Sequence, residues 1–266
     1  MRRSSTTVIL AVGLATVAAA GCSSSASTGS GASNATLKAD TSVSGGITVF
    51  AAASLQGAFT TLGKQFEAAH PGTTVKFSFG ASSSLATEIT SGSPADVFAS
   101  ASPQNMDQVT KAGDASKPVT FAKNVMEVAV PPSNPAHVTS VSDLANSSVK
   151  TALCQPQVPC GFTAAKVFSN AKISVKPVTL QPDVKSVLTQ VELDNVDAGM
   201  VYVTDVKAAG TKVKGVAIPA SENASTAYPI ATINSSKNKD TAQAFAAYVA
   251  SPAGQKVLAA DGFEKP

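Results

Sequence analysis

The sequence has no tryptophan and almost no arginine, and both absences narrow the possible functions. The only arginines are Arg2 and Arg3, so the chain beyond the N-terminus has none. A guanidinium group is the side chain best suited to a bidentate clamp on a carboxylate or phosphate. Any anion bound beyond the N-terminus must therefore be held by lysine or by neutral hydrogen-bond donors. Without tryptophan, the chain also lacks the usual aromatic platform for sugars.

Catalytic signatures are missing as well. The chain has no G-x-S-x-G, no P-loop and no H-E-x-x-H. His70 precedes Pro-Gly at a predicted helix end, and His137 lies in a loop rich in proline, serine and asparagine. A secreted hydrolase that used Ser54 or Ser82 would need a histidine as general base, and neither histidine is placed for that role. We therefore predict that the protein is not an enzyme and needs no cofactor.

The charges beyond the N-terminus are balanced and dispersed. With the arginines set aside, 18 lysines face 17 acidic residues, and neither sign clusters along the chain. A nucleic-acid-binding protein would show a basic stripe or patch. The sequence therefore predicts no nucleic-acid partner.

The first 22 residues have the pattern of a bacterial lipoprotein signal peptide. Two arginines precede an apolar stretch at 8–20, which is too short to span a membrane, and small residues lead to Cys22. This ending resembles a lipobox, which implies that Cys22 is acylated and anchors the protein to the outer face of the cell membrane. Secretion with Cys22 removed is the alternative. Residues 23–46, rich in serine, glycine and alanine, predict a flexible tether.

Cys154 and Cys160 are separated by five residues. In an exported protein a local disulfide is the default interpretation of such a pair. Two free thiols or a metal pair are the alternatives, although no histidine lies close enough in sequence to suggest a zinc site.

Strand and helix patterns alternate along the rest of the chain, which predicts an α/β fold with mostly parallel sheets flanked by helices. Short apolar runs that predict buried strands lie at 47–51, 96–99, 124–130, 149–153 and 198–203. Residues 123–224 contain a complete α/β set, whereas the strand at 226–233 and the last two helices lack a partner there. We predict two lobes, 47–122 plus 225–266 and 123–224, with a ligand cleft between them.

Small or hydroxylated residues recur where a predicted strand gives way to a predicted helix. These positions are Ser54, the stretch Ala-Ser-Ser-Ser at 81–84, Pro-Cys-Gly at 159–161 and Pro-Asp-Val at 182–184. A serine before a helix is commonly just an N-cap. However, the first N–H groups of a helix lack internal partners and carry the positive end of its dipole. Four such ends in one cleft would bind an anion without any charged side chain.

Longer stretches make the pattern specific: ITVFAAASL at 47–55, FGASSSLA at 79–86, PADVFASA at 94–101, VPCG at 158–161, MVYVTDV at 200–206 and YPIA at 228–231. Together they resemble the periplasmic molybdate-binding proteins of ABC transporters, which have the two-lobed type II periplasmic-binding fold. In this resemblance the oxyanion-binding residues are Ser54, Ser82, Cys160, Val184 and Tyr202. It implies that both serines donate through hydroxyl and backbone N–H, Cys160 and Val184 through backbone N–H, and Tyr202 through its hydroxyl.

The resemblance implies that the protein is a monomer that captures molybdate or tungstate and passes it to an ABC permease in the membrane. The metal then arrives as an oxyanion, with no direct protein ligand. The chain departs from the family at Cys160, where alanine is usual, and a backbone donor tolerates that change. Asp183 is expected to cap a helix with its carboxylate turned away from the ligand, and Asp96 and Asp205 are expected to hold loops or hinges.

Other ligands on the same fold are the competing hypotheses. Sulfate has the same charge and shape as molybdate but is smaller, so it should fit loosely in a close-packed cavity. Hydrogen phosphate carries a proton that would face an N–H donor. Organic acids usually need arginine. Ferric iron needs clustered tyrosines and carboxylates, and Tyr202, Tyr228 and Tyr248 are far apart in sequence.

Overall fold

The computed structural model describes residues 43–266, which fall within one compact unit of the chain. The predicted signal peptide, Cys22 and the tether as far as residue 42 lie outside the described residues. The first strand begins at Gly45, two residues earlier than the sequence pattern predicts. Within residues 43–266 no helix has both the length and the apolar character needed to cross a membrane.

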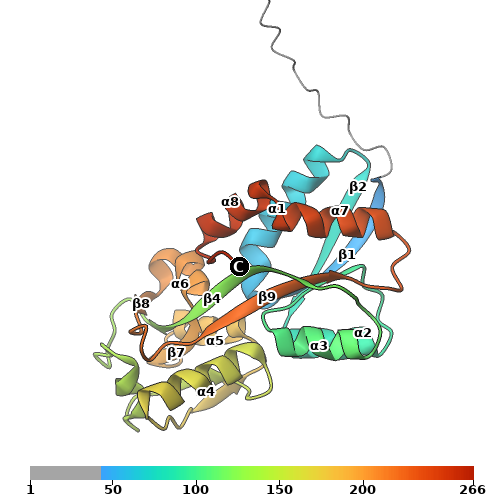
Figure 1. Ribbon diagram of the computed structural model, residues 1–266. Helices are drawn as coiled ribbons and strands as arrows, with labels where there is room; N and C mark the ends of the chain where they lie inside the picture. Colours follow the sequence, from blue (N-terminus) through green and yellow to red (C-terminus); the bar gives the residue numbers. More distant parts are fainter. Residues whose placement is uncertain (1–42) are drawn as a thin grey trace, which may run out of the picture. The chain divides into compact units, whose positions relative to one another are not determined.

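A nine-stranded mixed sheet runs through the molecule in the order β2-β1-β3-β9-β4-β7-β5-β6, with β8 paired to β4 (Figure 1). Its strands are β1 Gly45–Ala52, β2 Thr73–Gly80, β3 Val97–Ala99, β4 Val119–Val130, β5 Thr151–Cys154, β6 Thr179–Gln181, β7 Ala198–Tyr202, β8 Lys214–Val216 and β9 Ser225–Thr232. The pairs β1–β2, β1–β3, β5–β6 and β5–β7 are parallel. Within the described chain, every antiparallel pair includes β4 or β9.

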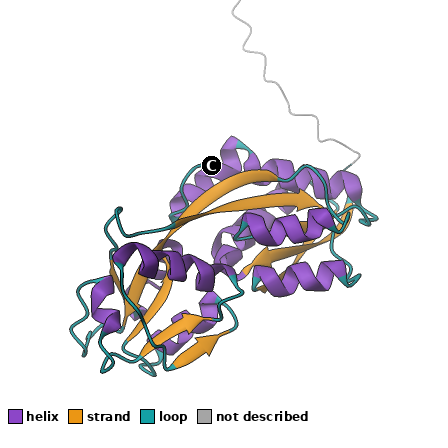
Figure 2. Ribbon diagram, turned by 60° about the horizontal axis from the view of Figure 1, so that its bottom comes forward, coloured by secondary structure: helices purple, strands orange, loops and turns teal. Residues whose placement is uncertain are grey.

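Helices pack on both faces of the sheet (Figure 2). They are α1 Gln56–Ala69, α2 Ser82–Thr90, α3 Pro103–Lys111, α4 Pro159–Ala171, α5 Val184–Glu192, α6 Val203–Ala209, α7 Lys239–Ala250 and α8 Pro252–Asp261, with 3-10 turns η1 Ala53–Leu55, η2 Val141–Ala145 and η3 Gly210–Lys212. The sequence pattern missed α6, because the apolar run of β7 leads directly into it without a turn residue between them.

The long strand β4 joins the two halves of the sheet. Its first half pairs with β9 as far as Val125, opposite Ser225. From Met126, opposite Tyr202, it pairs with β7 instead, and its end also pairs with β8. One continuous strand therefore passes from one half of the sheet to the other.

The buried apolar side chains form separate cores on either side of this crossing. The first lobe has two clusters, around Phe59, Phe66 and Phe245 and around Phe98 and Met106, built from residues 43–122 and 228–263. The second lobe has one cluster, built mainly from residues 126–218. This is the predicted two-lobed α/β architecture, with each lobe organised on parallel strands and the lobes joined by antiparallel ones.

Candidate functional site

A small cavity lies where the starts of several helices from both lobes meet. It has a volume of about 20 Å³, more than the roughly 10–15 Å³ that one water molecule needs. Its lining is Ala52, Ala53, Ser54, Gly80, Ala81, Ser82, Ala101, Val158, Pro159, Cys160, Asp183, Val184 and Tyr202. The structure thus brings together all five predicted oxyanion-binding residues, two from the first lobe and three from the second. A site of this size suits a ligand of only a few atoms.

Three helices present unused N–H groups at their first turns. In α4 the N–H groups of Gly161 and Phe162 both donate to the Val158 carbonyl, at 3.0 and 3.2 Å, which leaves the N–H of Cys160. In α2 the first intrahelical bond comes from Leu85 N–H, and the preceding Ala81 has no side-chain cap. Such orphan donors attract anions.

The start of α5 is arranged differently, because Asp183 caps it. The Asp183 Oδ1 atom accepts a hydrogen bond from Ser186 N–H at 2.9 Å, and its carbonyl accepts one from Val187 N–H at 3.2 Å. These bonds leave the N–H groups of Val184 and Lys185. The predicted capping role of Asp183 is confirmed, although Asp183 also lines the cavity, where it is the one acidic residue of the described chain.

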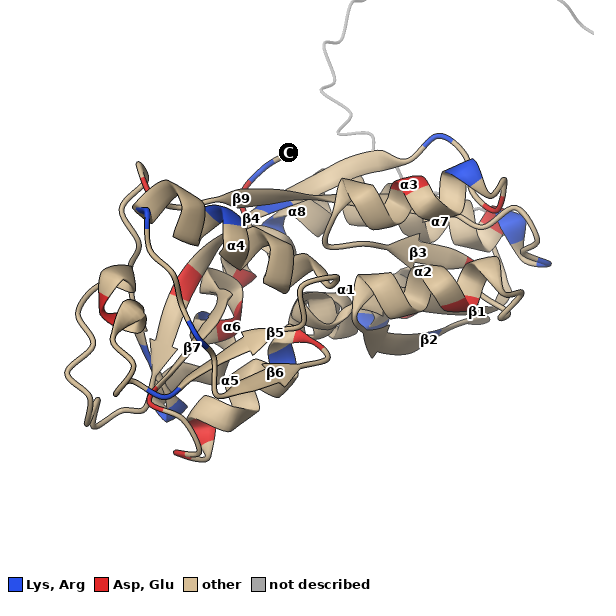
Figure 3. Ribbon diagram, turned by 90° about the horizontal axis from the view of Figure 1, so that it is seen from below, with Lys and Arg blue, Asp and Glu red and all other residues tan. Residues whose placement is uncertain are grey.

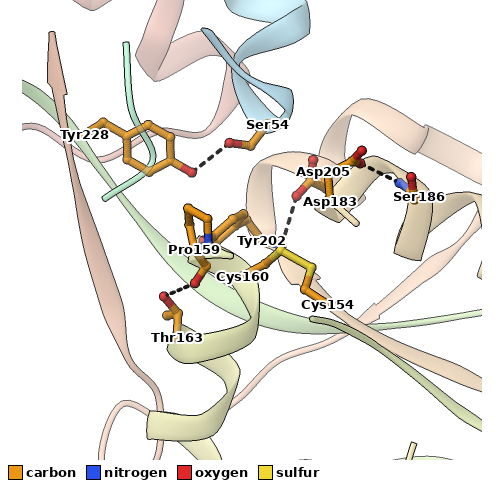
Figure 4. Close-up of a disulfide and its surroundings, with 10 residues drawn as sticks. All are labelled: Ser54, Cys154, Pro159, Cys160, Thr163, Asp183, Ser186, Tyr202, Asp205 and Tyr228. Carbon is orange, nitrogen blue, oxygen red and sulfur yellow. Dashed lines mark hydrogen bonds between the residues drawn. A yellow bond between two sulfur atoms is a disulfide. The ribbon is translucent and has the colours of Figure 1, made fainter. Parts of the chain in front are cut away.

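Both serine hydroxyls of the site already have a partner behind the cavity. Ser82 Oγ accepts a hydrogen bond from Ala101 N–H at 2.9 Å, so the hydroxyl hydrogen is left for another acceptor. Ser54 Oγ lies 2.9 Å from the Tyr228 hydroxyl (Figure 4). Ser54 and Ser82 are 6% and 1% exposed, so bulk water hardly reaches their hydroxyl groups. A ligand in the cavity can therefore be the second hydrogen-bond partner of each hydroxyl.

Tyr202 differs from these serines because its hydroxyl has no hydrogen-bond partner within residues 43–266. The residue is the last of β7, opens onto the cavity and is 1% exposed. Burial, followed by the neighbouring Tyr228 hydroxyl, raises the pKa of Tyr202 well above its ordinary value, so the phenol stays protonated. A buried O–H without an acceptor is costly and uncommon. The Tyr202 hydroxyl can therefore donate a hydrogen bond to a ligand in the cavity.

Asp205 holds the end of β7 in place, which agrees with the expectation that it holds a loop or hinge. Its Oδ2 atom accepts the Tyr202 N–H at 3.1 Å, and its Oδ1 atom lies 2.8 Å from Lys185 Nζ. Burial raises the pKa of Asp205, and the Lys185 ammonium opposes this shift. Asp96, similarly, accepts the Thr48 N–H at 2.7 Å between two strands of the first lobe. Neither Asp96 nor Asp205 lines the cavity.

The predicted disulfide between Cys154 and Cys160 is present, with the two Cα atoms 5.7 Å apart. It joins the end of β5 to the first turn of α4, and both half-cystines are buried (Figure 4). Gly161 permits this tight loop, since a Cβ atom there would lie 2.0 Å from the Gln155 carbonyl oxygen. The disulfide thus holds the loop that presents the N–H of Cys160.

The tyrosines are less separated than the sequence suggested. Tyr202 and Tyr228 come together with ring centroids 6.3 Å apart, whereas Tyr248 contacts Gln65 elsewhere. Distance along the chain was therefore a poor argument against an iron site. Residues 43–266 contain no group of three or more histidine, cysteine, aspartate and glutamate side chains that could hold a metal.

The sequence pattern missed three polar residues behind the cavity: Asn124, Thr204 and Tyr228. Asn124 Nδ2 lies 2.8 Å from Thr204 Oγ1 and 3.4 Å from the Tyr228 hydroxyl. An asparagine inside the apolar run of β4 was the available signal, since a buried amide needs partners. In Figure 3, positively and negatively charged residues of the described part lie along both lobes.

A two-lobed α/β fold with a small, donor-lined cavity where the lobes meet defines a solute-binding protein. Residues 47–264 match the family described as bacterial extracellular solute-binding protein, and the chain belongs to that family.

Several proteins similar to this chain are named as binding proteins for oxyanions. The molybdate-binding protein ModA of Mycobacterium tuberculosis is 42% identical over 221 residues, which cover 83% of this chain and 85% of the relative. The periplasmic molybdate-binding protein of Azotobacter vinelandii has a TM-score of 0.74 at 20% identity, over 83% of this chain and 99% of the other. The sulfate-binding protein SubI of M. tuberculosis has the same TM-score and identity, over 83% and 86%. The fold alone therefore does not separate the two oxyanions.

Proposed function

We propose that the protein captures molybdate or tungstate outside the cytoplasm and delivers it to an ABC importer. The observation that carries the proposal is the buried Tyr202 hydroxyl, which has no acceptor within residues 43–266 and lies at a cavity lined by hydrogen-bond donors. A tetrahedral oxyanion supplies only acceptors. The 42% identity to a molybdate-binding protein favours this anion over others of the same shape.

The proposed ligand donors are Ser54, Ser82, Cys160, Val184 and Tyr202. Two serine hydroxyls, the Tyr202 hydroxyl and four backbone N–H groups make seven donors. A hydrogen bond to a charged group contributes about 1.5–3 kcal/mol, so the seven give on the order of 10–20 kcal/mol before costs. Association and ordering cost several kcal/mol. A sub-micromolar Kd needs roughly 8 kcal/mol, which this donor set supports.

Lobe 1 is proposed to comprise residues 47–122 plus 225–266, and lobe 2 residues 123–224. Because the donors come from both lobes, the oxyanion stabilises the closed arrangement more than an open one, which is the difference in contacts that closure requires. The protein is proposed to act as a monomer, anchored through acylated Cys22 and a tether over residues 23–46. The closed form would then dock on the permease.

Selectivity is proposed to depend on size and protonation rather than on charge. Sulfate is smaller than molybdate and should leave some donors out of reach, while the proton of hydrogen phosphate needs an acceptor. Asp183 is the one carboxylate in the lining of the described chain, and because its Oδ1 atom already accepts the Ser186 N–H, its Oδ2 atom is the one left for that proton. Molybdate and tungstate are therefore expected to bind far more tightly than sulfate or phosphate.

Isothermal titration calorimetry of the purified protein with molybdate, tungstate, sulfate and phosphate tests the proposal. Tight binding of the two larger anions supports it. Sulfate binding as tight as molybdate would instead assign the protein to sulfate uptake, the competing function that the fold also permits. Tight phosphate binding would mean that Asp183 accepts a proton from the ligand. No binding of any of the four anions would overturn the oxyanion assignment.

A further inference from the structure

We infer that Asn124 and Tyr228 are positioning residues for the ligand, because they aim the hydroxyl hydrogen of Ser54 into the cavity. The inference rests on the proposed function, since it concerns how one of its donors is oriented. Neither residue lines the cavity, so neither can contact a bound ion directly.

The amide group of Asn124 has a defined orientation. Its Oδ1 atom accepts the Val125 N–H at 3.0 Å, so its Nδ2 atom points the other way. That nitrogen carries two hydrogens and can only donate. Its two neighbours are Thr204 Oγ1 at 2.8 Å and the Tyr228 hydroxyl at 3.4 Å, and both must therefore act as acceptors toward it.

The direction of the next bond follows from this first one. A phenolic oxygen that accepts from Asn124 keeps its own hydrogen for a different acceptor, and Ser54 Oγ lies 2.9 Å away. Ser54 in turn accepts from Tyr228, so its own hydrogen is free for the cavity. The order Asn124 to Tyr228 to Ser54 thus makes Ser54 a donor toward the ligand, which is the role an oxyanion requires.

Burial supports this order. Asn124 and Tyr228 are both 0% exposed and Ser54 is 6% exposed, so bulk water cannot substitute for a missing partner. Burial raises the pKa of Tyr228 above its ordinary value, and the phenol therefore keeps the hydrogen that it donates. A freely rotating Ser54 hydroxyl would contribute less to the binding free energy, because binding would have to fix its orientation at a cost in entropy.

The same amide also connects the two lobes. Asn124 lies opposite Thr226 of β9, two residues before β4 changes its partner from β9 to β7. Thr204, its second acceptor, belongs to α6 of the second lobe. The orientation of Ser54 in the first lobe is thereby tied to a residue in the second.

A double-mutant cycle measured by calorimetry with sodium molybdate tests the inference. Tyr228→Phe keeps the ring and its packing but removes the hydroxyl. We expect Tyr228→Phe to raise Kd about 10-fold in the wild-type background, and less than about 2-fold in the Ser54→Ala background, because the residue acts through Ser54. Asn124→Asp, which keeps the shape but removes the donor, should show the same dependence on Ser54.

Tyr248→Phe is the matched control, because its hydroxyl contacts Gln65 on an exposed surface away from the cavity and its loss should leave Kd unchanged. Equal losses from Tyr228→Phe in both backgrounds, or no loss in either, would overturn the relay while leaving molybdate binding by the wild type intact. If the wild-type protein binds none of the four anions, both the proposed function and the relay fail. Circular dichroism and thermal melting of each variant separate loss of folding from loss of binding.

Discussion

Removing the Tyr202 hydroxyl should change stability and ligand affinity in opposite directions. Tyr202→Phe keeps a ring that is 1% exposed and packed against Tyr228, and it deletes only an oxygen that has no partner in the described chain. Most substitutions in a protein core lower stability. This one removes an unsatisfied polar group, so the usual cost should be absent.

The magnitudes follow from the state of the hydroxyl. An unsatisfied buried polar group costs about 1–3 kcal/mol, and partial access of water in an open ligand-free form reduces that cost. The free energy of unfolding of ligand-free Tyr202→Phe should therefore equal that of the wild type or exceed it by up to about 1 kcal/mol. With the ion bound, the same change removes a hydrogen bond to a charged group, about 1.5–3 kcal/mol, or roughly a 10- to 150-fold weaker Kd.

Urea unfolding without ligand and calorimetry with molybdate measure the two effects. Tyr228→Phe is the control, because that hydroxyl has partners in Ser54 and Asn124, and its loss should lower stability by about 1 kcal/mol even without ligand. A loss of more than about 1 kcal/mol for ligand-free Tyr202→Phe, with unchanged affinity, would refute the reasoning. The hydroxyl would then be bonded within the protein and not to the ion.

Three further outcomes are expected. Ser82→Ala should weaken molybdate binding about 10-fold or more, since it deletes a donor. The double variant Cys154→Ala/Cys160→Ala should weaken binding less but lower the free energy of unfolding by roughly 2 kcal/mol, because it removes a cross-link between residues six positions apart. Calorimetry measures the two affinities, and urea unfolding measures the two stabilities. Lys185→Met should destabilise the protein at pH 7 by up to about 3 kcal/mol, because it leaves Asp205 buried and unpaired. That loss should shrink as the pH falls through the raised pKa of Asp205, since the protonated carboxyl needs no ammonium. Urea unfolding of both proteins at several pH values measures the loss, and a loss that stays constant with pH would contradict the prediction. Raising the salt concentration from 50 to 500 mM should change the molybdate Kd less than about 3-fold, because the donors are buried and uncharged, and a steeper dependence would indicate a lysine at the site.

The parts of the site that sequence predicted are those encoded over a few neighbouring residues. The start of α4 is an example: Pro159 at the first helical position, a small Gly161 and the two cysteines all lie within an eight-residue stretch. Ser82 at the start of α2 and the Asp183 cap of α5 are local in the same way. The structure gathers these separately encoded turns at one cavity.

The parts that sequence did not predict depend on contacts between distant segments. Asn124 and Tyr228 are separated by 104 residues, and Ser54 and Tyr228 by 174. No periodicity in either segment indicates the contact, because it exists only after β4 and β9 have paired. The helix α6 was not predicted for the same reason, because its start also depends on contacts between distant segments. Its start is fixed by the Tyr202 N–H donating to Asp205, and by the pairing of Asp205 with Lys185 of another helix.

The charge balance of these contacts bears on how the site tells one anion from another. Lys185 directly follows the Val184 donor, but its ammonium is paired with the buried Asp205 carboxylate. The pair has no net charge and therefore adds little attraction for an incoming dianion. The other carboxylate, Asp183, lines the cavity and would repel one. Since charge contributes so little, affinity has to come from the number of donors that a single ion can reach at once. That number depends on the distances from the central atom to the oxygens, so the size of the anion becomes the property that the site selects.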